Sequence, residues 1–238
     1  MARSLAHQSV ADLGGPSSIL TLQRNDHVRL ARLMDRARAT LPTGGATHQV
    51  ALRAVARLVF THAFAEEAVL FPAARRALPE GDPLSLRIEE DHQEVNELMA
   101  RLDMSSADDP EHPERLERTF AVLDADVRTE EDELLPRLQE VMGARQLRTV
   151  GRQWEFLRRT SPTRPHPVVS RRPPGQTLSA LPLTVIDRSR DRLQQLGEWT
   201  GGRLDPLLGP TDRVLALAAG AVERIPVIQY GERPETDR

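Results

Sequence analysis

The stretch HAFAEEAVLFP, residues 62–72, decides the fold. It begins with a histidine, continues with a Glu-Glu pair that starts at Glu66, and ends with a proline. Because residues four apart lie on one face of an α-helix, His62 and Glu66 point the same way. A helical bundle presents two ligands to a transition metal in this manner. The stretch therefore predicts a helix that carries half of a metal site.

A near-copy of this stretch, DVRTEEDELLP, occupies residues 126–136 and places Asp126 and Glu130 on one helix face. An Asp-His pair precedes each copy, ending at His27 before the first and at His92 before the second. Equivalent residues of the two copies lie about 65 positions apart. We therefore predict a duplicated pair of helices. Two such pairs, folded face to face, give a four-helix bundle with one site at its centre.

The composition excludes several classes of protein. The chain has 238 residues, no cysteine and a formal net charge of −3. Without cysteine there are no disulfides or thiolate metal sites, so a metal must be held by histidine, carboxylate, tyrosine or water. The charge gives no general attraction to nucleic acid or to an anionic membrane. No apolar run reaches the ~20 residues that cross a bilayer, and the N-terminus lacks the apolar core of a signal peptide. We therefore expect a cytoplasmic protein.

Helical spacing of apolar residues predicts four long helices joined by short turns, an up-down-up-down arrangement. Their expected limits are Ser17 or Ser18 to Pro42, Thr47 to Pro79 with a kink at Pro72, Pro83 to the loop at 103–111, and Pro113 to Gly143. A short helix over about 144–159 follows. Residues 1–16 read as a flexible leader, so the bundle with its trailing helix covers 17–159.

The composition changes after the bundle. Residues 160–176 are rich in proline and arginine, which predicts an extended and solvated linker. Residues 177–238 contain two amphipathic patterns, at 181–199 and 211–223, and no histidine. We expect a small helical C-terminal extension there, and the sequence assigns it no role.

The duplicated motifs resemble those of the haemerythrin-like, or HHE cation-binding, family. The resemblance covers about residues 17–142 and includes the Leu-Phe-Pro and Leu-Leu-Pro endings of the two stretches. It implies an all-α four-helix bundle that holds a dinuclear non-haem iron site with an oxo or hydroxo bridge. The implied metal ligands are His27, His62, Glu66, His92, Asp126 and Glu130. In this reading Glu66 and Glu130 bridge the metals and the histidines are terminal ligands.

Asp126 departs from the family pattern, which has a histidine at this place. The carboxylate binds a metal directly, binds through water, or leaves one metal position open. If it binds, the harder oxygen ligand favours ferric iron, and with it oxidation chemistry over reversible oxygen carriage. Manganese and zinc also accept such ligands. A degraded site with one metal or none remains the alternative.

Other side chains have less specific interpretations. We expect Glu67 and Glu131 to support the ligands or to lie on the surface, and Glu131 is an alternative to Glu130. Structural or surface roles are expected for His7, His48, His112 and His166.

The resemblance implies a protein that interacts with O2, peroxide or NO, in redox or oxygen sensing or in peroxide detoxification. One alternative is a metal-dependent sensory or interaction module without turnover, in which the metal state sets how residues 177–238 dock on the bundle. Another is a helical scaffold whose site has decayed. The sequence leaves open whether the protein is an enzyme, and it leaves open the oligomeric state.

Overall fold

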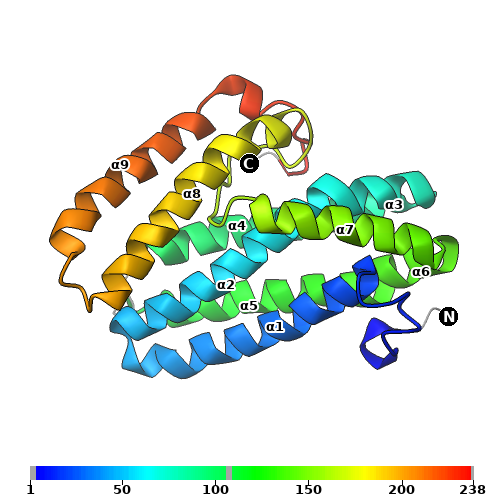
Figure 1. Cartoon of the computed structure of the whole chain (residues 1–238), viewed down its shortest axis with the longest axis horizontal. Coiled ribbons are helices and arrows are strands. Elements are labelled where there is room, and N and C mark those ends of the chain that lie inside the picture. The colour runs from blue at the N-terminus through cyan, green and yellow to red at the C-terminus, as the bar shows by residue number, and fades with distance from the viewer. Residues whose placement is uncertain (1–3, 106–108, 237–238) are drawn as a thin grey trace.

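The computed structural model describes residues 4–105 and 109–236, and over these ranges the chain consists of helices and turns without any strand. Long helical stretches lie side by side in its first part (Figure 1). They are α1 (Ile19–Thr40), α2 (Gly45–Ala65) with α3 (Phe71–Ala77), α4 (Gly81–Met104), and α5 (His112–Thr129) with α6 (Leu135–Val141). α1 packs on α2, and α4 packs on both α5 and α3. The sequence predicts these limits to within a few residues.

Three more helices follow, α7 (Ala144–Thr160), α8 (Gly175–Trp199) and α9 (Asp205–Glu223). Short 3-10 turns lie at Leu5–His7, Leu41–Thr43 and Pro226–Ile228. α7 packs on α1 and α2, while α8 and α9 pack on each other as a hairpin. Ion pairs from Arg53 and Arg57 of α2 to Glu198 and Asp191 of α8 tie the hairpin to the bundle. None of the described helices has the combination of length and apolar character that a membrane span requires.

A π turn interrupts each helix that carries a Glu-Glu pair. At Glu66–Leu70 the amide of Phe71 donates to the carbonyl of Glu66, five residues back. At Glu130–Leu134 the amide of Leu135 donates to the carbonyl of Glu130 in the same way. A proline follows directly in both cases, and its ring would collide with the carbonyl four residues earlier in a regular α-helix. The first π turn lies directly before Pro72, where the sequence predicts a break in the regular helix.

Two apolar clusters fill the bundle, and the predicted metal ligands lie between them. One cluster contains Phe71 and Trp154, and the other contains Phe120. On α1, for example, Leu20 belongs to the first cluster and Leu30 to the second, with His27 between them. The same change of cluster occurs around His62 on α2, His92 on α4 and Asp126 on α5. A polar layer therefore crosses an otherwise apolar core, and burial of the flanking clusters positions it.

The expectation of a flexible leader is wrong for the described part of residues 1–16. Leu5 and Leu13 are fully buried and belong to the cluster that contains Trp154. The 3-10 turn that carries Leu5 packs on α1 and on the π turn at Glu130–Leu134, which give the leader an apolar surface to cover.

The expectation of a solvated linker is also wrong. We call residues 161–174, which join α7 to α8, the strap. Arg164, His166 and Arg171 of the strap are each less than 10% exposed. Each finds a carboxylate: Asp191 for Arg164, Asp187 and Glu223 for His166, and Glu67 for Arg171. Pairing offsets the cost of burying their charges, which composition alone cannot reveal.

Candidate metal centre

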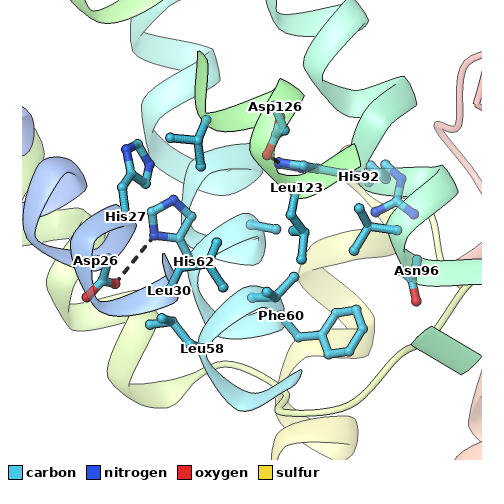
Figure 2. Close-up of a pocket in the computed structure, with 15 residues that line it drawn as sticks. Asp26, His27, Leu30, Leu58, Phe60, His62, His92, Asn96, Leu123 and Asp126 are labelled. Atoms are coloured by element: carbon cyan, nitrogen blue, oxygen red, sulfur yellow. Dashed lines mark hydrogen bonds and ion pairs between the residues drawn. The ribbon is translucent and has the colours of Figure 1, made fainter. Parts of the chain in front are cut away.

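The six predicted metal ligands converge in the polar layer of the bundle. In Figure 2, His27 and His62 lie on one side of a pocket, and His92 lies with Asp126 on the other. Glu66 and Glu130 stand at the first positions of the two π turns and are 0% and 1% exposed. Residues from α1, α2, α4 and α5 thus meet at one buried place, as the duplicated motif predicts.

Glu66 faces histidines from two different helices. Its Oε1 lies 3.2 Å from Nε2 of His62, and its Oε2 lies 3.6 Å from Nε2 of His92. Glu130 approaches the third histidine, with its Oε2 3.0 Å from Nε2 of His27. Each of these carboxylates can therefore share its two oxygens between neighbouring metal positions.

Two groups of three residues have ligand atoms close enough to hold a metal ion. The first is His27, His62 and Glu130, and the second is Glu66, His92 and Glu130. Within each group the ligand atoms lie within 4.8 Å of one another. Glu130 belongs to both groups, as expected of a bridging carboxylate. Asp126 adjoins the second group, since its Oδ2 lies 3.7 Å from Nε2 of His92.

A second carboxylate contacts the other ring nitrogen of His27 and of His92. Nδ1 of His27 lies 2.8 Å from Oε1 of Glu131, and Nδ1 of His92 lies 3.0 Å from Oε1 of Glu67. Such a partner fixes the tautomer and the orientation of the ring and makes the other nitrogen a better metal ligand. The sequence left open whether Glu67 and Glu131 support the ligands or lie on the surface. In the structure both contact a histidine.

The third histidine has a support that the sequence analysis did not assign. Nδ1 of His62 lies 3.4 Å from Oδ2 of Asp26, and Figure 2 marks this contact. The available signal was the Asp-His dipeptide that precedes both copies of the motif, at Asp26 and Asp91.

Electrostatics favour charged imidazoles at this site. Burial opposes an imidazolium, but the hydrogen bonds to Glu130 and Glu131 outweigh it and raise the pKa of His27 to about 9. Burial also opposes charge on His92, where Asp126 is the largest of the carboxylate effects that raise the pKa to about 10. The carboxylates thus favour positive charge beside these imidazoles, which a bound metal cation would supply in place of the protons.

The carboxylates show the same crowding of negative charge. Burial, followed by the charge of Glu130, raises the pKa of Asp126 to about 7. Burial, followed by the charge of Glu66, raises the pKa of Glu130. For Asp26, burial acts in the same direction, but His62 and Arg158 outweigh it and lower the pKa.

The donor set fits a metal. Several buried ligand atoms have no hydrogen-bond partner among the described residues, namely both carboxylate oxygens of Glu66, Oε1 of Glu130 and Oδ1 of Asp126. Leaving such atoms without a partner costs several kcal/mol of folding free energy at roughly 1–3 kcal/mol each. A divalent cation would supply the missing partner, and imidazole with carboxylate suits iron, manganese or zinc.

A small cavity adjoins the ligands. It has a volume of about 30 Å³ and is lined by His27, His62, His92, Asp126 and mainly apolar side chains such as Phe60 and Leu123. This volume holds one or two atoms of solvent size. The site therefore offers room for a small ligand beside the place where a metal would bind.

Two residues of α7 contact the predicted ligand His62 and its support Asp26, and the sequence analysis did not predict these contacts. The ring of Trp154 on α7 meets that of His62 edge-on, with centroids 5.3 Å apart. Arg158 of α7 approaches Asp26 at 3.5 Å. Their contacts depend on how α7 folds back, which no local pattern encodes.

The remaining buried histidines lie away from the site. His48 and His112 face each other through their Nε2 atoms at 3.0 Å. His48 lies about 20 Å along α2 from His62 by helix geometry. His166 lies between Asp187 and Glu223. These three positions agree with the structural role predicted for them.

The comparisons with known proteins agree with the geometry. The family model of the hemerythrin HHE cation binding domain matches residues 18–138, about half of the chain. An uncharacterized hemerythrin-like protein of Schizosaccharomyces pombe is 24% identical over 135 residues, which make up 56% of this chain and 66% of that protein. The chain thus spans just under two thirds of that relative's length. No solved structure gives a significant match. Because the matched region contains all six predicted ligands, the chain belongs to the hemerythrin HHE cation-binding domain family.

Proposed function

We propose that the protein holds two iron ions in an up-down-up-down four-helix bundle and that this site interacts with O2, peroxide or NO. The observation that carries the proposal is the placement of Glu66, whose two oxygens face His62 and His92 on different helices. The two candidate groups that share Glu130 support the same arrangement. In it, Glu66 and Glu130 bridge the metals, the three histidines are terminal ligands, and Asp126 completes the set.

The residues around the cavity support redox chemistry with a small ligand. When bound, the metals would supply Lewis-acid and redox chemistry. Asp126 lines the cavity, and its pKa is raised by burial and by Glu130 to about 7. A carboxyl group beside the cavity can pass a proton to or from a small ligand bound there. Phe60 and Leu123 give the cavity an apolar wall. These features favour peroxide detoxification or redox sensing in the cytoplasm.

Metal content and absorption spectra test the proposal. About two irons per chain are expected, together with near-ultraviolet charge-transfer bands that disappear in His62→Ala. The control is His166→Gln, which removes a buried histidine outside the site and is expected to keep both irons. One metal per chain would reduce the proposal to a mononuclear site. No metal in the wild type would leave a helical scaffold.

A second candidate is a sensory module without turnover. It is favoured by the contact between the strap and Glu67, the carboxylate that supports His92. In this case the metal state sets how the strap and residues 177–238 dock on the bundle. Sustained consumption of peroxide supports the first candidate. Slower hydrogen exchange of strap amides on metal loading, without any turnover, supports the second.

A further inference from the structure

Arg171 of the strap contacts two residues beside the predicted metal ligand His92. One is Glu67, which contacts its ring, and the other is Gln93, the next residue in the chain. Its Nη1 donates to Oε1 of Glu67 at 3.1 Å, and its Nη2 donates to Oε1 of Gln93. Oε1 of Glu67 also lies 3.0 Å from Nδ1 of His92. One carboxylate oxygen therefore joins a predicted metal ligand to a guanidinium that comes from outside the matched domain.

These contacts are buried, which makes them dependent on one another. Arg171 is 6% exposed and Glu67 is 4% exposed. Burial alone would raise the pKa of Glu67, but Arg171 and His92 outweigh it and lower the pKa. Removal of either partner leaves an uncompensated buried charge, which costs far more than loss of an exposed pair.

The strap is itself anchored, so that Arg171 is delivered in a fixed position. The amides of Thr163 and Arg164 donate to Oδ2 of Asp187 on α8 at 2.9 and 3.1 Å. At its other end, Gln176 at the start of α8 donates to the second oxygen of Glu67 at 3.2 Å. Both oxygens of Glu67 are thus held by residues beyond the bundle.

We infer that Arg171 is a positioning residue of the metal centre: it holds Glu67, which in turn orients His92 toward the metal. The inference rests on the proposed function, because it requires a metal at His92. The strap is then part of the metal centre, and the four-helix domain without it has an incompletely supported ligand.

Arg172 is a matched control next in the chain. It is also an arginine of the strap, but within the described part of the chain it pairs with Glu89 and Asp82 and not with a predicted metal ligand or its support. Replacement of Arg172 by Gln therefore weakens the anchoring of the strap and leaves the contacts of Glu67 in place.

The experiment compares full-length variants loaded with cobalt(II), following release of the metal to a chelator and the absorption bands of the bound ion. We expect Arg171→Gln to release metal about tenfold faster and to shift the bands, since loss of support for a histidine ligand weakens metal binding by about 10–100-fold. Arg171→Lys is expected to recover part of the loss, because it keeps the charge without the fork. Arg172→Gln is expected to resemble the wild type.

A double variant tests whether Arg171 acts through Glu67. If it does, Arg171→Gln adds nothing to the release rate of Glu67→Gln. Additive effects would overturn the inference, and so would equal effects of Arg171→Gln and Arg172→Gln, which would show that the strap acts only as a cover. Absence of metal from the wild type would instead refute the proposed function.

Discussion

The two halves of the candidate metal centre share one sequence pattern and differ at one decisive place. In the first half, Asp26 supports His62, the ligand at the start of the repeated stretch. In the second half, Asp91 occupies the equivalent place, but the ligand position holds Asp126. Asp91 then adds to burial and to Glu130 among the effects that raise the pKa of Asp126. A carboxylate suited to support a histidine faces another carboxylate instead.

This difference teaches that a ligand and its support can change separately. Each half still supports a histidine of the other half. Glu131 of the second half contacts His27, and Glu67 of the first half contacts His92. The second half has lost only the local pair between positions 91 and 126. The two halves therefore differ in one predicted ligand, while His27 and His92 have matching carboxylate contacts.

The largest expected effect comes from the carboxylate that both candidate groups share. Glu130→Gln is expected to remove both metals, with a loss of affinity above about 100-fold, since it takes away a ligand and not merely its support. Glu66→Gln is expected to leave one metal at His27, His62 and Glu130. Metal analysis after dialysis measures both. The control is Glu133→Gln, a half-exposed residue of the same π turn. Equal loss in both ligand variants would contradict the unequal roles.

The pH dependence of metal uptake should show how the halves are protonated. His27 and His92 have pKa values raised to about 9 and about 10, so both carry a proton at neutral pH that a metal must displace. Metal affinity is therefore expected to rise with pH, by about tenfold per unit for each proton released, or about 100-fold between pH 6.5 and 8.5 for one proton. Competition with a chelator at several pH values measures this. An affinity that is constant over this range would contradict the protonated state.

Restoring the missing histidine should make the halves equivalent. Asp126→His is expected to raise the affinity for the second metal by about tenfold, because Asp91 stands where it can support the new ring. The double variant Asp126→His/Asp91→Asn is expected to lose most of this gain. Metal titration followed by absorption measures both. If the double variant keeps the whole gain, Asp91 is not a support.

Replacing Asp26 or Asp91 alone is expected to have a smaller effect on metal binding. Asp26→Asn is expected to weaken metal binding by up to about tenfold, since His62 loses a charged partner. Asp91→Asn is expected to leave metal binding unchanged and to lower the pKa of Asp126, because one nearby negative charge is gone. Metal titration of the two variants side by side is the measurement. A larger effect of Asp91→Asn would reverse the comparison.

A histidine held by carboxylates outside the site has the smallest expected effect on metal binding, so its effect is measured on stability. Burial opposes charge on His166, but Asp187 and Glu223 raise its pKa from 6.5 to about 9. The proton thus stabilises the fold fully below about pH 6.5, and this stabilisation is lost as pH rises through about 9. His166→Gln is expected to lower the free energy of unfolding by about 1–3 kcal/mol at pH 7 and by less at pH 10. Urea unfolding at the two pH values measures this. A deficit that grows with pH would contradict the assignment.

The sequence predicts the helices and the convergence of the six candidate residues well because both follow from periodicity. Helical spacing places His62 with Glu66 and Asp126 with Glu130, and the duplication brings the halves together. Asp26 could have been found, since its dipeptide is repeated at Asp91. Arg171 could not, because its contact with Glu67 spans 104 positions and depends on the path of the strap.

The leader and the strap show the limit of reasoning from composition. Proline and arginine are typical of solvated linkers, yet Arg164 and Arg171 are buried because carboxylates on other elements meet them. Leu5 is buried for a comparable reason, since α1 and the π turn at Glu130–Leu134 pack against its 3-10 turn. Local composition reports which side chains prefer water. It does not report which partners the fold supplies.

The paired π turns also determine how many carboxylates one helix can direct into the core from adjacent positions. A π turn has more residues per turn than an α-helix, so neighbouring side chains diverge less. The turns begin at Glu66 and at Glu130, at the same place in each repeat. Glu66 and the next residue, Glu67, are both buried, and both approach the ring of His92. One widened turn therefore lets a single helix supply a predicted metal ligand and the carboxylate that supports another.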